Sequence, residues 1–347
     1  MMKIDDFLAI LNNFTRSVII KKNDARVIIG ERGGRIIWIS IGEDSNLLWT
    51  HPRIEKVFEA NEWNQGGLRT WISPERNFFY RDPENFRGWF CPHTIDPASY
   101  RIVKSGNSRV VLEGEISAQD KLHNVDLRGY IRKEIELLEV YRGIVRLRVR
   151  EGLLVDYPLR VNLWILAQVP ITEAGVGTVL IPVKPMAQPI HYFVEIPPNR
   201  LTVKTDHVAF KIDGCFTSKI GVKPEDLREL GRAEISYVAK FNSGDWYMLM
   251  LSTKDAPIGQ EDCLDVPKLN PEGLRGAVQS YNSGPEAFSD IRFGEIELHF
   301  SPAINIAGKN LSTIEYELIG FVGRREQVIS KIRRMMKIKT PKIYIKP

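Results

Sequence analysis

Short apolar and β-branched runs recur along most of the chain, and clusters of Gly, Asn, Asp and Ser separate them. Such runs with turn residues between them predict β-strands. The predicted strands lie at residues 18–20, 26–29, 35–41, 46–49, 101–103, 110–117, 125–138, 144–150, 159–169, 192–195, 207–212, 234–241, 246–252, 295–300 and 313–321. Because no helical pattern alternates with them, a doubly wound parallel sheet is not favoured. Many strands joined by turns predict an all-β fold, either a sandwich or a barrel.

Helical patterns occur only near the two ends of the chain. Asp5 or Asp6 can cap a short helix that runs to about Asn13. Residues 324–337 predict a second helix, amphipathic and basic, and a strand-like end, KIYIKP, follows it. A basic amphipathic helix sometimes binds lipid or an acidic partner. Packing on the sandwich with a solvated basic side is the simpler expectation.

The length of 347 residues does not by itself require two domains, since large β sandwiches reach this size. We expect a single domain over residues 1–347. Its core spans residues 18–321, with an N-terminal helical extension at 1–17 and a basic C-terminal extension at 322–347.

The formal net charge of +5 belongs to the C-terminal end. From Arg324 onward the chain has nine Lys or Arg residues and a single acid, Glu326, so the rest is close to neutral. A basic end without a basic core does not indicate a nucleic-acid surface. We therefore expect no nucleic-acid partner, and the oligomeric state stays open.

Targeting and cofactor signals are weak throughout. The N-terminal sequence lacks the layout of a secretory signal, and no run approaches the roughly 20 apolar residues of a membrane span. Cys91, Cys215 and Cys263 are far apart and form no CxxC pair, so neither a disulfide framework nor a zinc site is indicated. No Gly-rich phosphate loop opens a helix. We expect a cytoplasmic protein without a membrane anchor, a bound metal or another cofactor.

Three segments, read as extended strands, carry polar and aromatic residues on one face. Since side chains alternate between the faces of a strand, the rows are Arg69, Trp71, Ser73 and Glu75; Arg160, Asn162, Trp164, Leu166 and Gln168; and Phe293, Glu295, Glu297 and His299. A sugar presents apolar C–H patches and hydroxyl groups, so its site combines aromatic platforms with charged and amide groups. A solvated sheet face also carries polar residues, but it has little reason to carry tryptophan. The rows favour a carbohydrate-binding groove across one sheet.

The segment NQGGLRTWISPERNF, residues 64–78, resembles the galactose mutarotase-like (aldose 1-epimerase-like) superfamily, in particular uncharacterised microbial branches with a GG-x-R-x-W-x-x-PE segment. GGRIIWISIGEDSNLLW is similar to the family's opening strands, and other landmarks follow in the expected order: RVNLWILAQVP, FTSKIGVKPEDL and QSYNSGPEAFSDIRFGEIELHF. The resemblance covers about residues 18–321. It implies a large antiparallel β supersandwich and a saccharide or glycan as the partner.

The resemblance also implies acid–base chemistry. Mutarotases open and close an aldose ring with a carboxylate base, which removes the anomeric hydroxyl proton, and a histidine acid, which protonates the ring oxygen. Glu297 best matches the base, and Glu295 is second. Asn162 and Trp164 stand where the central-strand histidine is sought, so the acid is open, with His299 beside the two glutamates as a candidate. Other candidates lie in proline-rich loops: His93 and His191.

We therefore hypothesise a carbohydrate-binding protein that is also an epimerase of an aldose or sugar derivative. The candidate binding residues are Arg69, Trp71, Glu75, Arg76, Asn162 and Trp164, and the candidate catalytic residues are Glu297, Glu295 and His299. Alternatives are a noncatalytic sugar sensor and a glycoside hydrolase that uses Glu75 and Glu297. A lyase would instead use Arg69 and Arg76 to neutralise a uronate.

Overall fold

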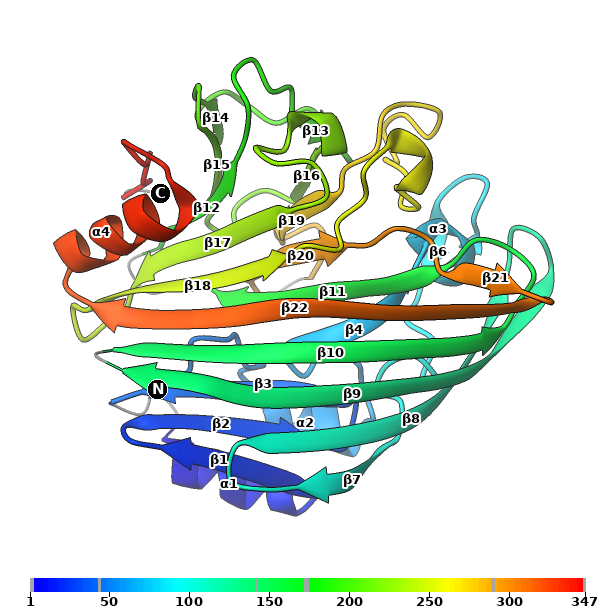
Figure 1. Ribbon diagram of the computed structural model, residues 1–347, viewed down its shortest axis with the longest axis horizontal. Helices are drawn as coiled ribbons and strands as arrows, with labels where there is room; N and C mark the ends of the chain where they lie inside the picture. Colours follow the sequence, from blue (N-terminus) through cyan, green and yellow to red (C-terminus); the bar gives the residue numbers. More distant parts are fainter. Residues whose placement is uncertain (1–2, 43–44, 142, 172–174, 289–290, 346–347) are drawn as a thin grey trace.

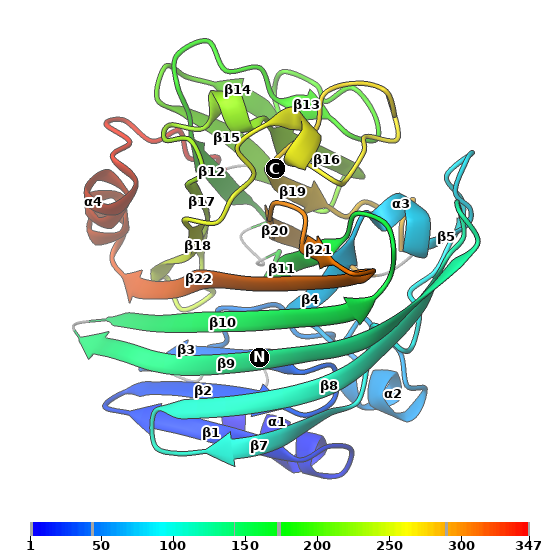
Figure 2. The ribbon, with the colours of Figure 1, turned by 45° about the vertical axis from the view of Figure 1, so that its right-hand side comes forward.

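The computed structural model describes residues 3–42, 45–141, 143–171, 175–288 and 291–345. Within them, two large sheets of antiparallel strand pairs form a sandwich, and helices lie at its periphery (Figures 1 and 2). The predicted all-β antiparallel sandwich is therefore confirmed.

The strands and helices have the following bounds. The nine-stranded sheet has the order β1 (Ser17–Lys22), β2 (Ala25–Gly30), β3 (Arg35–Ile41), β4 (Leu68–Ser73), β11 (Asn162–Pro170), β20 (Phe293–His299), β19 (Val278–Asn282), β16 (Ser218–Val222) and β13 (Ile190–His191). The eleven-stranded sheet has the order β14 (Leu201–Val203), β15 (His207–Ile212), β12 (Gly177–Pro182), β17 (Ala233–Lys240), β18 (Trp246–Thr253), β22 (Lys309–Gly323), β10 (Ile144–Asp156), β9 (Val125–Tyr141), β8 (Arg109–Asp120) and β7 (Tyr100–Ser105), and β21 (Ile304–Ile306) also pairs with β22. A hairpin joins β5 (Tyr80–Asp82) to β6 (Arg87–Trp89). The helices are α1 (Ile4–Asn12), α2 (Ile54–Glu59), α3 (Glu75–Phe78) and α4 (Arg325–Met336), with short 3₁₀ turns at Pro224–Asp226 and Gln260–Asp262.

Burial along the strands shows which faces are covered. The long strand β9 alternates between buried and more exposed positions, because its outer face meets solvent. By contrast, β20 is buried at every position, and β11 at every position before Pro170. A strand that is buried on both faces must be covered on its outer side as well. In the nine-stranded sheet, loops supply this cover over β11 and β20, and they enclose the candidate site described below.

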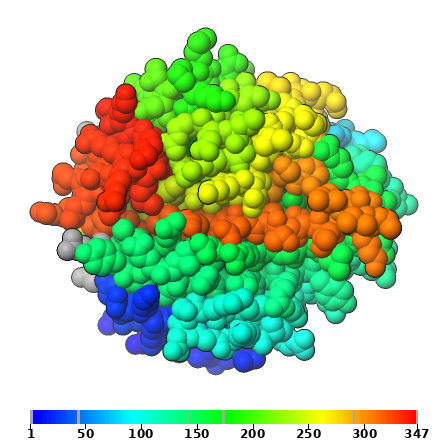
Figure 3. Space-filling model, in the orientation of Figure 1, coloured from blue at the N-terminus to red at the C-terminus, as the bar shows by residue number. Residues whose placement is uncertain are grey.

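Helix α4 packs on the eleven-stranded sheet, as expected. Val328, Ile332 and Met336 are buried against a cluster that includes Met248 on β18 and Ile319 on β22. Arg325, Arg333 and Arg334 are exposed, whereas Lys331 is half-buried and lies over the Phe321 ring. In Figure 3 the red helix lies at one end of the orange band that β22 forms across the visible face.

Two predictions about the ends of the chain are wrong. The α1 N-cap is Lys3 rather than an aspartate. Asp5 and Asp6 instead lie in the first turn, where negative charge is favourable beside the helix dipole. The described part of KIYIKP, residues 342–345, forms no strand. It lies against the sheet instead, where the Tyr344 N–H donates to the Thr178 hydroxyl at 2.9 Å.

None of the helices in the described ranges is long and apolar enough to cross a membrane.

Candidate functional site

The strand register brings the three predicted rows together. Trp164 on β11 is paired with Trp71 on β4 and with His299 on β20. Leu166 is paired in the same way with Arg69 and Glu297. Because directly paired residues project to the same face of a sheet, all three rows lie on the outer face of the nine-stranded sheet.

Two further strands extend this face. Glu295 on β20 is paired with Tyr281 on β19, and Tyr281 with Lys219 on β16. The sheet therefore places a lysine beside the two glutamates, although β16 is far from β19 and β20 in sequence.

A cavity of about 620 Å³ lies over these residues. Its floor is formed mainly by side chains from the sheet: Arg69, Trp71, Trp164, Lys219, Tyr281, Phe293, Glu295 and Glu297. Its walls include aromatic side chains from loops and from the β6 hairpin: Trp63, Trp89, Phe193, Phe216 and Phe288. The charged groups thus lie at the bottom of a cavity with an aromatic rim.

Glu297 is fully buried at the floor of this cavity. Its Oε2 accepts a hydrogen bond from the Trp164 indole N–H at 3.0 Å and lies 3.1 Å from Lys219 Nζ. Burial, the largest single influence, raises the pKa of Glu297, but Lys219 and His299 together outweigh burial, so the pKa is lowered overall. Its Oε1 has no hydrogen-bond partner among the described residues. Glu297 is therefore an ionised carboxylate with one oxygen available.

Lys219 is the cation that keeps Glu297 ionised. Burial lowers the pKa of this lysine, but the carboxylates of Glu297, Asp265 and Glu75 together raise it above its ordinary value. The ammonium also lies 4.6 Å from the centre of the Trp164 ring, in cation–π geometry. Lys219 is therefore a permanent positive charge and not a proton donor at neutral pH.

The pKa of Glu75 is raised, in contrast to that of Glu297. It begins α3 directly after Pro74, and its Oε1 accepts a hydrogen bond from the Trp89 indole N–H at 2.9 Å. Burial, with the nearby Asp265 and Glu297 carboxylates, raises the pKa of Glu75 to about 7, although Lys219 opposes the rise. Near neutral pH this carboxyl group can hold a proton or release it.

Arg69 and Glu295 form a second ion pair in the floor. Arg69 Nη2 donates to Glu295 Oε1 at 2.5 Å, and the guanidinium lies 4.2 Å from the centre of the Trp71 ring. Burial raises the pKa of Glu295, and Glu297 adds to this, against the attraction of Arg69. Arg69 Nη1 has no hydrogen-bond partner in the part of the chain that the structure describes. A buried N–H without a partner is costly, and this one belongs to a cavity-lining residue.

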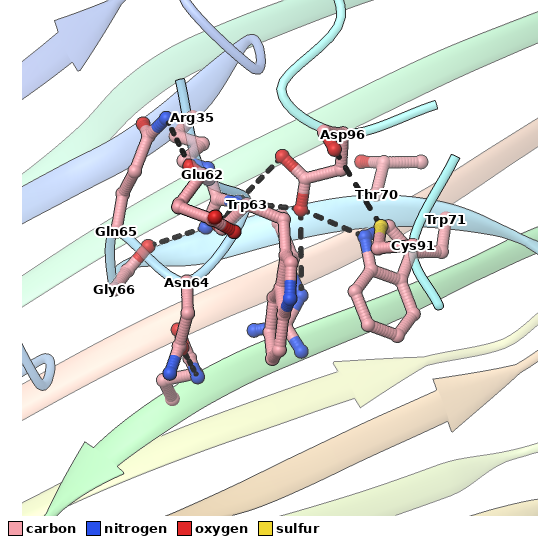
Figure 4. Close-up of polar contacts among 12 residues, drawn as sticks. Arg35, Glu62, Trp63, Asn64, Gln65, Gly66, Thr70, Trp71, Cys91 and Asp96 are labelled. Carbon is pink, nitrogen blue, oxygen red and sulfur yellow. Dashed lines mark hydrogen bonds and ion pairs between the residues drawn. The ribbon is translucent and has the colours of Figure 1, made fainter. Parts of the chain in front are cut away.

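Asp96 positions Arg69 and Trp71 from behind. It accepts hydrogen bonds from Arg35 Nη2 at 2.5 Å and from the Trp71 indole N–H at 2.8 Å, and it lies 3.8 Å from Arg69 Nε. Figure 4 shows Asp96 between Arg35 and Trp71. Arg35 also donates to the Gly66 carbonyl at 2.6 Å, so the segment before β4 is fixed by the same network.

The NQGG turn needs both of its glycines. Gly66 and Gly67 have φ angles of +101° and +82°. A Cβ on Gly66 would lie 2.3 Å from the Trp49 carbonyl oxygen, and one on Gly67 would lie 2.6 Å from the Ile36 carbonyl oxygen. The turn therefore lets the chain pass close to its neighbours and enter β4 in the register that directs Arg69 and Trp71 outward.

Six of the nine sequence-derived candidates line the cavity: Arg69, Trp71, Glu75, Trp164, Glu295 and Glu297. Trp71 and Trp164 are only 3% and 2% exposed and contact each other edge to face, so they form the floor. The expectation that residues 69–75 are all extended is wrong, because β4 ends at Ser73 and α3 follows Pro74. Glu75 reaches the cavity from this helix instead.

The other three candidates lie outside the cavity lining. Arg76 donates to the Pro83 carbonyl at 2.8 Å and lies over the Phe86 ring. Asn162 donates to the Ser301 carbonyl oxygen and so ties the start of β11 to the neighbouring loop. His299 is buried beyond the edge of the floor, where its ring stacks on Trp164.

Sequence reasoning missed Lys219, Asp265 and the aromatic rim. In FTSKIGV, Lys219 precedes the apolar Ile220, and Val222 is apolar as well, so the alternation of a strand could have flagged it. No comparable pattern exists for Asp265 or for Trp63, which lie in loops.

A second, larger groove of about 1440 Å³ runs along the open edge of the sandwich. Residues of β7 and β8 and the segment around Arg32 line it, together with His93, and none of the nine candidate residues above does. No group of three or more His, Cys, Asp or Glu side chains arranged for a metal ion occurs in the described ranges.

A family profile and several solved structures match this chain. Residues 160–345, more than half of the chain, match the profile of a family described as a family of unknown function, DUF6786. The chain belongs to the DUF6786 family. The part that matches DUF6786 includes Trp164, Lys219, Glu295 and Glu297, whereas Arg69 and the rest of the β4 row precede it. No curated protein matches the sequence.

Solved structures show what the fold of this DUF6786 chain is similar to. A proposed aldose 1-epimerase from Klebsiella pneumoniae has a TM-score of 0.50 at 11% identity, over 94% of this chain and 84% of that one. A proposed mutarotase (YeaD) from Salmonella typhimurium has a TM-score of 0.49 at 10% identity, over 90% and 92%. The likeness to the Klebsiella pneumoniae protein confirms the predicted galactose mutarotase-like fold. At such identities the likeness concerns the fold alone.

Proposed function

We propose that this protein binds a saccharide in the cavity over β4, β11 and β20 and interconverts the anomers of an aldose or a sugar derivative. The observation that carries the proposal is the pair of carboxyl groups at the cavity. Glu297 is held ionised with a free Oε1, and Glu75 has a pKa of about 7. Groups whose environments push their pKa values apart are suited to act as base and acid.

The roles follow from these protonation states. Glu297 removes the proton of the anomeric hydroxyl while the bond between the anomeric carbon and the ring oxygen breaks. Glu75, in its protonated form, gives its proton to that ring oxygen. The open-chain aldehyde rotates, and the reverse transfers close the ring with either configuration. Glu75 thus takes the part of the histidine that this sequence lacks.

Three groups support binding rather than proton transfer. Arg69 Nη1 is a donor without a partner among the described residues, so we assign it to a sugar oxygen. The half-buried rings of Trp63 and Trp89 can cover apolar C–H faces of a sugar. Trp71 and Trp164 support these rings and the carboxylates from below.

His299 has a positioning role in this proposal. Its Nε2 lies 3.8 Å from Glu297 Oε2, and its ring lies behind Trp164. It therefore helps to keep the carboxylate ionised without touching the sugar.

Anomer exchange by NMR tests the proposal. A panel of aldoses that includes glucose, galactose, xylose and mannose is mixed with the protein, and the exchange between α and β resonances is measured. We expect acceleration for at least one sugar, which Glu297→Gln abolishes. Glu113→Gln, on the outer face of the other sheet, is the matched control and keeps the wild-type rate. Binding without acceleration would mean a noncatalytic sugar-binding protein, and neither binding nor acceleration would contradict the proposal.

The pKa of Glu75 also favours a second candidate. A protonated carboxyl group and an ionised carboxylate are the two groups of glycoside hydrolysis. Release of nitrophenol from p-nitrophenyl glycosides, lost in both Glu75→Gln and Glu297→Gln, would favour hydrolysis over anomer exchange.

A further inference from the structure

An unbroken series of aromatic rings borders the cavity. Neighbouring ring centres are 5.3 Å apart for Trp89 and Trp63, 6.2 Å for Trp63 and Phe288, and 5.5 Å for Phe288 and Phe293. The series goes on to Tyr281 and Phe193, each at 6.0 Å from the ring before it. We call these six residues the aromatic arc. All six line the cavity, and all except Phe293 are half-buried.

The arc is larger than the proton-transfer chemistry requires. That chemistry uses Glu297 and Glu75, and Trp89 is the arc residue that donates a hydrogen bond to one of them. Phe193 and Phe288 contact other aromatic rings of the arc, are half-buried and line the cavity. Partly exposed aromatic rings that gather at one place mark a surface that a ligand covers.

Polar groups accompany the arc at the rim. Thr217, Lys268 and Glu286 line the same cavity and lie at its exposed edge. The Thr217 hydroxyl donates to Glu286 at 2.8 Å. Aromatic faces with hydroxyl, ammonium and carboxylate groups beside them suit a sugar ring, which has both C–H faces and hydroxyls.

The volume indicates how many rings fit. A hexose has about twelve non-hydrogen atoms. If each of them took the roughly 30 Å³ that a water molecule occupies in the liquid, the hexose would need at most about 360 Å³. The cavity has about 620 Å³. A single sugar at the charged floor would leave much of the cavity and most of the aromatic arc without contacts.

We infer that the ligand is a short glycan of at least two sugar rings. This inference rests on the proposed function, because the reacting ring lies over Glu297 and Glu75. The next ring stacks on the far part of the arc, at Phe193 and Tyr281, and bonds to the polar groups of the rim.

Calorimetric titration with three homologous series tests the inference. The probes are glucose, cellobiose and cellotriose; glucose, maltose and maltotriose; and xylose, xylobiose and xylotriose. In one series we expect the disaccharide to bind at least about tenfold more tightly than the monosaccharide, the gain from one aromatic stacking contact at the upper end of its range.

Variants show whether the arc causes the gain. Phe193→Ala should weaken binding of the disaccharide by about tenfold, and it should weaken binding of the monosaccharide much less. Phe14→Ala, at a half-buried phenylalanine outside the cavity, is the matched control and should change neither affinity. Equal affinities for one and two rings in every series, or equal losses for both in Phe193→Ala, would overturn the inference.

The outcomes for the two proposals are separable. Tight disaccharide binding without anomer exchange would contradict the catalytic proposal and leave the glycan inference standing. Anomer exchange of a monosaccharide that binds as well as its disaccharide would do the reverse. Absence of binding by every probe would overturn both.

Discussion

Two buried lysine–glutamate pairs lie on opposite faces of the nine-stranded sheet, and they differ in one respect. Lys133 and Glu151 lie between the two sheets, with Nζ and Oε1 3.4 Å apart. Lys219 and Glu297 lie on the outer face, with Nζ and Oε2 3.1 Å apart. All four side chains are at most 3% exposed. The second pair lines the cavity of about 620 Å³.

The inner pair is saturated with hydrogen bonds. Glu151 accepts from the Thr70 hydroxyl at 2.8 and 2.9 Å and from the Tyr316 hydroxyl at 2.7 Å. Lys133 donates to Thr70 at 2.6 Å and to the Gly34 carbonyl at 2.9 Å. The outer pair leaves Glu297 Oε1 without a partner among the described residues.

This difference separates structure from function. A buried pair whose hydrogen bonds are all made fixes how the sheets pack. A buried carboxylate at a cavity, with one oxygen that lacks a hydrogen-bond partner, is instead available to bind a ligand. Strand β4 contributes residues to the surroundings of both pairs, since Thr70 points inward while Arg69 and Trp71 point outward.

Lys133→Met should cause the largest loss of stability. It leaves Glu151 as an uncompensated buried charge, which costs about 3–5 kcal/mol. Urea unfolding measures the loss. The double variant Lys133→Met/Glu151→Leu should recover much of it. A single-variant loss below about 1 kcal/mol would mean that the inner pair does not stabilise the packing of the sheets.

Glu297→Gln should affect activity far more than stability. Loss of a general base lowers the rate by at least about 100-fold, which corresponds to about 2.7 kcal/mol. The free energy of unfolding should change by less than about 1 kcal/mol, because active-site charges seldom stabilise the fold. A large loss of stability with the activity retained would mean that Glu297 has a structural role and not a catalytic one.

Lys219→Met should be milder than Lys133→Met, at about 1–2 kcal/mol, since Glu297 can take up a proton at the cavity. Without the ammonium the pKa of Glu297 rises. The acid limb of the pH–rate profile should therefore move to higher pH, which a merely structural lysine would not cause. An unshifted limb would contradict the role of Lys219.

The pH dependence of the wild type gives the smallest effect. Glu75 acts in its protonated form, and its pKa is about 7. Activity should therefore fall by about tenfold per pH unit as the pH rises above about 7. Glu75→Gln should remove this alkaline limb along with most of the activity. A rate that still rises through pH 8 would rule out Glu75 as the acid.

The fold and part of the site could be predicted from local patterns. Alternation along Arg69–Ser73, Asn162–Gln168 and Phe293–His299 identified the outward rows, because the period of a strand depends only on its own residues. The same reasoning placed Asn162 and His299 in the site, although they lie beyond its edge. Alternation gives the face of a residue but not its distance along the strand from the cavity.

The rest depends on contacts between distant segments. Lys219 reaches Glu297 only because β19 lies between β16 and β20, an order that no local pattern encodes. Glu75 was included for the wrong reason, since Pro74 ends the strand and a helix directs the carboxyl group to the cavity. Trp63 comes from a loop and Trp89 from the short β5–β6 hairpin, and the course of both segments is set by the sheets that they join.

The most direct measurement is a crystal structure with the sugar that binds best in the calorimetric panel. We expect sugar oxygens within hydrogen-bonding distance of both Glu297 Oε1 and Arg69 Nη1, two buried atoms of the floor that lack partners among the described residues. A sugar bound elsewhere, for example in the groove along β7 and β8, with those two atoms untouched, would contradict it.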